Sequence, residues 1–563
     1  MQLTDVTLDD KFTLQRGRIF VTGSQALARL PMLQRGLDAA AGLNTAGYIS
    51  GYRGSPLGGY DMALWNARRH LEKAQIKFHP GLNEDLAATA IWGTQQVGLN
   101  GRSDYDGVFS IWYGKGPGVD RTGDVFKHGN LAGTAPHGGV LVLAGDDPMA
   151  KSSTVAHQSE PALIAASIPV FNPASIQEYV DYGLAAFALS RYAGVWVGMK
   201  CITDIVEGSA SIEVDPGRAV FRTPDDFALP PEGVHIRQPD WALDQERRLV
   251  RVRMPAVQAF LRANGFDRVT HEAPRRRLGI VTSGKSWADL MGAFDQLGLD
   301  ETTRAALGIS VYKPAVVWPL EPEGARAFAT GQEELLVIEE KRGLIEEQLA
   351  RILYDGDARP RLVGKTDELG APLVAADGEL SVREVGRILL ARLSRRAEDS
   401  EFVARLEAAL SGSALPATTP AAPRQPWFCA GCPHNTSTRV PDGSRAFAGI
   451  GCHTMALLMP NRRTETFTQM GGEGAQWIGQ APFSKDGHVF QNLGDGTYCH
   501  SGILAIRAAV AAGVNITYKI LFNDAVAMTG GQAPDKPQTP WGITRQVTAE
   551  GVRQVVVVSD EPE

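Results

Sequence analysis

Two short segments in the last quarter of the chain combine glycine with oxygen-bearing side chains. Asn492–Thr497 reads NLGDGT and follows an apolar run, and Asn523 follows the next apolar run. The order strand, acidic turn, helix, strand, amide brings Asp495 and Asn523 to the ends of adjacent parallel strands. Gly494 and Gly496 let backbone N–H groups approach phosphate oxygens, and Mg²⁺ prefers hard oxygen ligands. The segments together predict a site for Mg²⁺ and a diphosphate.

A Gly-Asp-Gly sequence is also a common tight turn. Taken alone, Gly494–Gly496 is better explained in that way. The spacing to Asn523 favours the binding site, because a simple turn does not need an amide at the end of the following strand.

Three of the five cysteines form a second group that could do chemistry. Cys429 and Cys432 form a Cys-x-x-Cys pair, Pro433 follows directly, and Cys452 comes about one supersecondary unit later. A proline directly after a cysteine is typical of iron–sulfur ligand runs. The pattern favours a [4Fe-4S] cluster, although such a cluster normally takes four thiolates and only three are well placed.

Two other interpretations of these cysteines stay open. A zinc site could add His434 or His453 to the three thiolates, which gives acceptable zinc ligands. Inert buried thiols are the third interpretation. Cys499 lies just beyond the Gly-Asp-Gly turn and Cys201 belongs to the first domain, so neither is an obvious fourth ligand.

Short apolar runs alternate with helical patterns along the whole chain, which predicts an α/β fold of several doubly wound parallel sheets. Runs without alternation suit strands that are buried on both faces of such a sheet. The predicted strands include 17–22, 107–112, 139–144, 195–199, 311–317, 489–493, 516–522 and 555–559.

Changes in composition predict three domains joined in part by a linker rich in Ser, Ala, Thr and Pro. The predicted parts are a first domain over 1–240, a middle α/β domain over 275–398, a helix end and linker over 399–426, and a third domain over 427–563. Parallel domains usually continue past their fourth or fifth strand. The chain is therefore interpreted as truncated or split at its C-terminal side.

The composition excludes several classes of protein. The 563 residues contain 56 Lys and Arg against 63 Asp and Glu, with no basic tract, which argues against a nucleic-acid partner. No segment reaches the roughly 18 unbroken apolar residues of a membrane span. Five cysteines, three of them clustered, do not suit a disulfide framework, and the acidic N-terminus does not resemble a secretory leader. These features predict a cytoplasmic protein without membrane contact.

Several motifs resemble those of thiamine-diphosphate enzymes. Asp495 with Asn523 is similar to the thiamine-diphosphate signature, and 528–532 (MTGGQ) is similar to its continuation in the 2-oxoacid:ferredoxin oxidoreductases. The closest resemblance is to the indolepyruvate (arylpyruvate) ferredoxin oxidoreductases of the fused bacterial branch, and it covers essentially the whole chain. It rests on 428–434 (FCAGCPH), 449–453 (GIGCH), 470–474 (MGGEG) and 48–56 (YISGYRGSP).

The resemblance implies roles for the matched residues. The side chains of Asp495 and Asn523 and the carbonyl of Ala525 would hold Mg²⁺. The remaining cofactor contacts would come from Gly494, Gly496, Thr497 and Gly472. Cys429, Cys432 and Cys452 would be cluster ligands.

The resemblance also implies a catalytic glutamate in the first domain. Glu84, within 81–87 (GLNEDLA), matches the residue that hydrogen-bonds N1′ of the cofactor. A carboxyl kept protonated in an apolar pocket can donate to N1′ and drive the aminopyrimidine to the imino form that deprotonates the thiazolium carbon. The alternative is an exposed charge at a helix start, favoured by the helix dipole. Arg53 and Ser55 are assigned to the 2-oxo acid, although related short enzymes often have proline where this chain has Arg53.

The implied fold consists of domains of the thiamine-diphosphate-enzyme type. The implied reaction is oxidative decarboxylation of an aryl 2-oxo acid, such as indolepyruvate, to the acyl-CoA, with electrons passed through the iron–sulfur cluster to ferredoxin. Coenzyme A, ferredoxin and a second copy of the chain would be partners, and gamma-type and ferredoxin-like segments would lie in a longer chain or a partner subunit. The alternatives are a non-oxidative 2-oxo acid decarboxylase, which would not need clustered cysteines, and a non-catalytic subunit or fragment.

Overall fold

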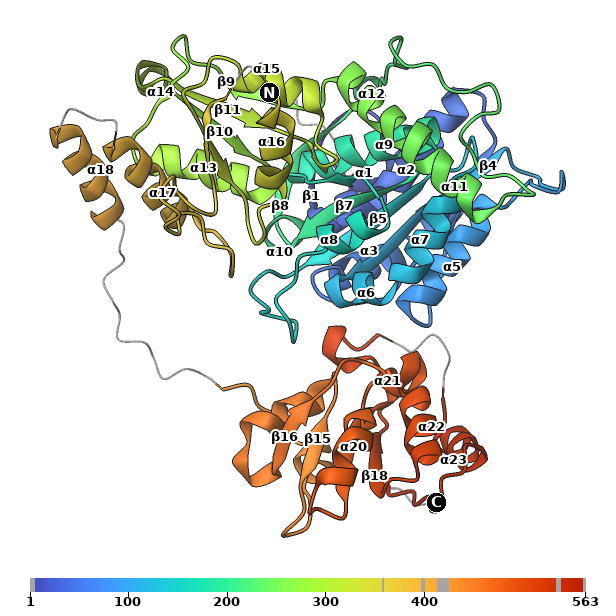
Figure 1. Ribbon diagram of the computed structural model, residues 1–563. Helices are drawn as coiled ribbons and strands as arrows, with labels where there is room; N and C mark the ends of the chain where they lie inside the picture. The colour runs from blue at the N-terminus through green and yellow to red at the C-terminus, as the bar shows by residue number, and fades with distance from the viewer. Residues whose placement is uncertain (1–5, 357–358, 396–399, 413–424, 533–537, 560–563) are drawn as a thin grey trace. The chain divides into compact units, whose positions relative to one another are not determined.

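The computed structural model describes residues 6–356, 359–395, 400–412, 425–532 and 538–559. The chain divides into two compact units, which are drawn from blue to brown and from orange to red in Figure 1. The first unit comprises residues 1–80 and 84–416, and the second comprises 81–83 and 417–563. Each unit is built around parallel β-sheets, so the predicted α/β fold is confirmed.

A seven-stranded sheet forms the centre of the first unit. In spatial order its strands are β12 (Val316–Trp318), β6 (Val170–Phe171), β7 (Trp196–Ile202), β5 (Val140–Asp146), β4 (Gly107–Lys115), β2 (Thr45–Gly51) and β3 (Ile76–Phe78). All neighbouring pairs are parallel except β12 with β6. Every residue of β5 and β7 is buried, because helices cover both faces of the sheet.

The two faces of this sheet belong to different hydrophobic clusters. Ile111 and Tyr113 of β4 pack with α2 (Gly23–Ala40) and α9 (Ile176–Ala193). Trp112, which points to the opposite face, packs with residues of α5 (Glu84–Gln95) and α7 (Gly123–Ala132). These helices surround the central strands in Figure 1.

A five-stranded sheet forms the second half of the first unit. Its order is β14 (Arg361–Val363), β13 (Glu334–Ile338), β10 (Leu278–Thr282), β11 (Ile309–Lys313) and β9 (Arg268–His271), and only β9 is antiparallel to its neighbour. Two helices, α13 (Gly284–Gln296) and α17 (Val382–Ser394), pack on one face together with α18 (Ser400–Gly412). The opposite face contacts α15 (Pro322–Ala329) and α16 (Leu344–Tyr354).

One strand prediction in the first unit is wrong, and another is confirmed as a strand but not as part of a parallel sheet. The strand predicted over 311–317 is divided into β11 and β12, which belong to different sheets. Pro314 lies between them and has no backbone N–H to donate to a continuous ladder. The strand at 17–22 exists as β1, but it pairs antiparallel with β8 (Ser209–Val214) outside the parallel sheets. Only two of its six residues are buried, as expected for a strand without helices on both faces.

The second unit contains a four-stranded sheet in which all pairs are parallel. Its order is β16 (Thr464–Phe467), β15 (Ala446–Ala448), β17 (Val489–Gly494) and β18 (Ile516–Leu521). Leu493 packs with α22 (Ile503–Ala512) and α23 (Pro540–Ala549), and Phe447 packs with Trp477 of α20 (Ala475–Gln480).

The strand predicted over 555–559 is absent from the described structure of that segment. Its four valines, 555–558, are between 37% and 90% exposed. A run of valine has high β-propensity, but that propensity is realised only where a neighbouring strand and a packed face are available.

None of the described helices is both long and apolar enough to cross a membrane.

Candidate functional site

The carboxylate of Asp495 joins the ends of two neighbouring strands in the second unit. Asp495 follows β17 directly, and its Oδ1 accepts a hydrogen bond from the N–H of Gly496 at 2.9 Å. Its Oδ2 accepts from the N–H groups of Asn523 at 3.0 Å and Asp524 at 2.7 Å, just beyond β18. The structure therefore brings Asp495 and Asn523 together at the carboxyl edge of the sheet.

The turn after β18 is shaped by its own polar side chains. Asn523 Oδ1 accepts from the N–H of Ala525 at 3.1 Å. Asp524 has a φ of 53°, in the left-handed region that Asp and Asn tolerate better than most residues. The turn thus holds the backbone of Asn523 and Asp524 against the buried Asp495 carboxylate. Carboxylate, amide and carbonyl oxygens, which Asp495 and this turn contain, are the ligand types that suit Mg²⁺.

The loop after β15 meets the Gly-Asp-Gly turn at the same edge. Thr497 Oγ1 donates to the carbonyl of Ile450 at 3.1 Å, which ties the turn to the loop after β15. A Cβ atom placed on Gly494 would meet only ring atoms of His453, at 3.7 Å or more. In the loop after β16, the N–H of Gly472 donates to the carbonyl of Gln469 at 3.1 Å. Open parallel sheets bind ligands at this edge, so the arrangement fits a magnesium–diphosphate group.

The three clustered cysteines lie near one another in the second unit. Cys429 is exposed, whereas Cys432 and Cys452 are half-buried, and all are free thiols. Burial raises the pKa of Cys452, and the neighbouring Cys432 and Cys429 raise it further. His434 Nδ1 lies 3.5 Å from Cys432 Sγ.

No group of three or more His, Cys, Asp or Glu side chains within the described ranges is arranged to hold a metal ion. The three thiols therefore supply the ligand type for an iron–sulfur cluster without a preformed metal geometry. Cys499 is half-buried in the segment after the Gly-Asp-Gly turn. Cys201 is fully buried in β7, and burial raises the pKa of its thiol, so it behaves as a packing residue.

Glu84 is the first residue of α5 in the first unit and is only 6% exposed. Its backbone carbonyl accepts a hydrogen bond from Trp112 Nε1 at 3.0 Å. Its side chain packs so closely on Gly118 that a Cβ there would lie 2.6 Å from Glu84 Cγ. The structure thus excludes the alternative of an exposed charge at a helix start.

Arg53 and Ser55 lie in the loop after β2, at the carboxyl edge of the seven-stranded sheet. Arg53 is buried and Ser55 is half-buried. The side chain of Lys115, the last residue of β4, packs closely against Gly54, which lies between them. A Cβ atom added to this glycine would lie only 2.8 Å from the Lys115 side chain. Burial lowers the pKa of Lys115, whereas Asp147 and Glu84 act in the opposite direction. Lys115 therefore links the predicted substrate loop to the predicted catalytic glutamate.

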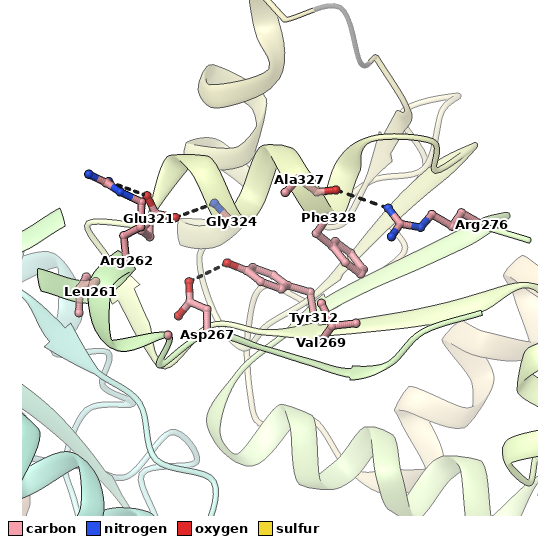
Figure 2. Close-up of a pocket in the computed structure, with 11 residues that line it drawn as sticks. Leu261, Arg262, Asp267, Val269, Arg276, Tyr312, Glu321, Gly324, Ala327 and Phe328 are labelled. Carbon is pink, nitrogen blue, oxygen red and sulfur yellow. Dashed lines mark hydrogen bonds and ion pairs between the residues drawn. The ribbon is translucent and has the colours of Figure 1, made fainter. Parts of the chain in front are cut away.

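A cavity of about 320 Å³ lies elsewhere in the first unit, between the end of α12 (Met254–Asn264), β9 and α15. Figure 2 shows the Tyr312 hydroxyl donating to Asp267, a contact of 2.6 Å. Tyr312 also stacks on Phe328, with ring centroids 5.1 Å apart. Burial raises the pKa of Asp267 to about 6. The predicted site residues do not line this cavity.

Two parts of the chain match known protein families. Residues 268–414 match the family described as the indolepyruvate oxidoreductase domain. Residues 449–559 match the C-terminal TPP-binding domain of thiamine pyrophosphate enzymes, and this segment contains Asp495 and Asn523. The thiamine-diphosphate-enzyme type predicted for the fold is thereby supported in the second unit.

Relatives match over nearly the whole chain. The indolepyruvate oxidoreductase subunit IorA from Pyrococcus horikoshii is 23% identical, over 99% of this chain and 82% of that protein. The same subunit from Methanothermobacter marburgensis is 25% identical, over 93% of this chain and 78% of that protein. The chain is similar to the indolepyruvate oxidoreductases over nearly its whole length. This similarity confirms the resemblance to the indolepyruvate oxidoreductases that the motifs predict, while the fused bacterial branch stays a prediction.

A solved structure of 2-oxoglutarate:ferredoxin oxidoreductase from Magnetococcus marinus is 14% identical, with a TM-score of 0.47. The match covers 68% of this chain and 65% of that one.

Beside the predicted residues, the first unit contains a buried charged network that the sequence did not reveal. His157 is 8% exposed and contacts Asp120 Oδ2 through Nε2 at 2.8 Å and Asp146 Oδ1 through Nδ1 at 3.4 Å. Asp146 ends β5, and Lys200 Nζ lies 4.0 Å from it. Burial lowers the pKa of His157, but hydrogen bonds to Asp120 and Asp146 outweigh burial and raise it to about 9. The adjacent Asp146 and Asp147 at the end of an apolar run, and His157 shortly after them, are sequence signals that could have indicated it.

This network predicts a pH-dependent stability of the first unit. The folded pKa of His157 lies above its ordinary value of 6.5, so its stabilisation is complete below pH 6.5 and is lost as the pH rises through about 9. The shift corresponds to about 3 kcal/mol. We expect the thermal midpoint of the first unit to fall between pH 6.5 and pH 9.5, as measured by calorimetry.

His157→Gln should flatten this fall, whereas His128→Gln, at an exposed histidine, should leave it unchanged. An equal fall in the wild-type protein and in His157→Gln would contradict the assignment.

Proposed function

We propose that the protein is a thiamine-diphosphate-dependent oxidoreductase that oxidatively decarboxylates an aryl 2-oxo acid, such as indolepyruvate, to its acyl-CoA. Electrons would leave through an iron–sulfur cluster to ferredoxin. One observation carries the proposal: the Asp495 carboxylate gathers the ends of β17 and β18 within the segment that matches a TPP-binding family. The IorA relatives support the choice of an aryl 2-oxo acid.

The second unit would bind the charged end of the cofactor. Asp495, Asn523 and the carbonyl of Ala525 would hold Mg²⁺, and Asp495 Oδ1, which accepts only from the N–H of Gly496, keeps a lone pair for the metal, whereas Oδ2 accepts from both Asn523 and Asp524. The backbone of Gly494, Gly496, Thr497 and Gly472 would contact the diphosphate. When bound, thiamine diphosphate supplies a carbon nucleophile and an electron sink for decarboxylation.

The first unit would act on the pyrimidine and the substrate. Glu84, which is buried beside Trp112 and Gly118, would share a proton with N1′ of the pyrimidine. Arg53 and Ser55 would orient the carboxylate of the 2-oxo acid, because a buried guanidinium pairs well with a carboxylate.

The cysteines favour oxidative over non-oxidative decarboxylation. Cys429, Cys432 and Cys452 would supply three thiolates to a [4Fe-4S] cluster, with the fourth ligand from Cys499 or from outside the chain. A non-oxidative decarboxylase has no use for such a group. Coenzyme A, ferredoxin and a second copy of the chain complete the proposed partners. The five free thiols fit a reducing cytoplasm.

Asp495→Asn should weaken binding of Mg²⁺-thiamine diphosphate by about 100-fold or more, because it removes the carboxylate ligand. Calorimetric titration measures this affinity. Asp442→Asn is the matched control, since Asp442 is an exposed aspartate of the same unit. An unchanged affinity in Asp495→Asn would remove this residue from the binding site.

Glu84→Gln should leave cofactor affinity within a few-fold of the wild-type value but slow proton exchange at the thiazolium carbon by about 10²–10⁴-fold, as expected for a positioned acid. Deuterium exchange followed by NMR gives this rate. Glu72→Gln, at an exposed glutamate that pairs with Arg68, should exchange at the wild-type rate. Fast exchange in Glu84→Gln would exclude a role in proton transfer.

Cys452→Ser should abolish the iron-dependent visible absorbance of the anaerobically purified protein. Cys201→Ser, at the buried cysteine of the first unit, should retain it. Metal analysis accompanies the spectrum. Stoichiometric zinc, or no metal at all in the wild-type protein, would contradict the iron–sulfur assignment.

A further inference from the structure

His453 is a buried histidine whose ring lacks a hydrogen-bond partner. The residue is 1% exposed, and neither Nδ1 nor Nε2 has a partner among the described residues. Buried polar atoms are normally satisfied by protein, water or a ligand, because desolvation without a hydrogen bond is unfavourable. The ring nitrogens are therefore available to a bound ligand beside them.

The position of the ring points to the carboxyl edge of the sheet. The His453 ring lies against two glycines, Gly451 and Gly494. A Cβ atom added to Gly451 would lie 2.8 Å from His453 Cε1, and one added to Gly494 would lie 3.7 Å from the same atom. These glycines belong to the loop after β15 and to the end of β17. The ring thus packs between two strand ends, directly beside the turn that begins with Asp495.

A second buried side chain on the same strand lacks partners. Asn492 is fully buried, and neither its Oδ1 nor its Nδ2 has a partner in the described structure. Side chains alternate along a strand, so Asn492 and Gly494 lie on the same face of β17. This is the face against which the His453 ring packs. Two independent side chains therefore leave polar atoms unsatisfied on one face of β17.

The neighbouring His434 contacts both the His453 ring and one of the cysteines. The two imidazoles stack with centroids 6.4 Å apart and an angle of 18°, and His434 is the one whose Nδ1 lies 3.5 Å from Cys432 Sγ. A neutral imidazole carries one N–H donor, which suits an oxygen acceptor.

We infer that His453 is a further cofactor-binding residue, whose ring N–H donates to an oxygen of the diphosphate held at the 494–497 turn. This inference rests on the proposed function. It assigns to His453 the recognition of a diphosphate oxygen, and to His434 the contact with the cysteine group.

The test compares two substitutions in the full chain. His453→Phe keeps the ring volume but removes the N–H, and His453→Gln restores an N–H donor. Calorimetry measures the affinities for Mg²⁺-thiamine diphosphate and for Mg²⁺-pyrophosphate. We expect His453→Phe to weaken both about 10-fold and His453→Gln to recover most of the loss. His488→Phe, at a histidine of the same unit that contacts Thr517, should bind as the wild type does.

A second measurement on the wild-type protein does not depend on the folding of a variant. In ¹⁵N-histidine NMR, addition of Mg²⁺-pyrophosphate should shift a ring N–H signal that is absent from His453→Gln. The inference is overturned if the wild type binds thiamine diphosphate but no histidine signal shifts, or if His453→Phe binds equally well. It is also overturned if His453→Phe changes only the iron-dependent spectrum, which would place the ring at the cysteines.

Failure of the wild-type protein to bind thiamine diphosphate would instead overturn the proposed function itself.

Discussion

The carboxylate of Asp495, bound to three backbone N–H groups, is the interaction on which the carboxyl edge of the second unit depends. It fixes the Gly-Asp-Gly turn through Gly496 and holds the turn after β18 through Asn523 and Asp524. Carboxylate–amide hydrogen bonds are stronger than neutral ones, so one side chain can align two strand ends. The same side chain is the proposed Mg²⁺ ligand, and the metal would therefore bind to a preorganised group.

The first unit contains a comparable group of predicted site residues at a sheet edge. Arg53, Glu84 and Lys115 all lie at or beside the carboxyl ends of strands in the seven-stranded sheet, and Arg53 and Glu84 are buried. Burying charges is costly unless they are paired or used. The proposal uses them for the organic part of the cofactor and for the substrate, while the second unit provides oxygen ligands for the metal and the diphosphate.

The sequence predicted the features that depend on local pattern, and it failed where distant packing decides. The buried strands β5 and β7, with their largely apolar runs, and the proximity of Asp495 and Asn523 follow from periodicity and topology. Three features depend instead on which strands of the folded sheets have a free edge for pairing: the split at Pro314, the antiparallel pairing of β1 and the absent strand at 555–559. Likewise, the unsatisfied ring of His453 and the burial of Lys115 arise from loops distant in sequence.

The most direct test of the central claim is calorimetric titration of the full wild-type chain with thiamine diphosphate, in Mg²⁺ and again in excess EDTA. The account predicts saturable binding in Mg²⁺ that is lost in EDTA, because the diphosphate is held through a metal on Asp495 and Asn523. Absence of binding in Mg²⁺, or equal binding in EDTA, would contradict it.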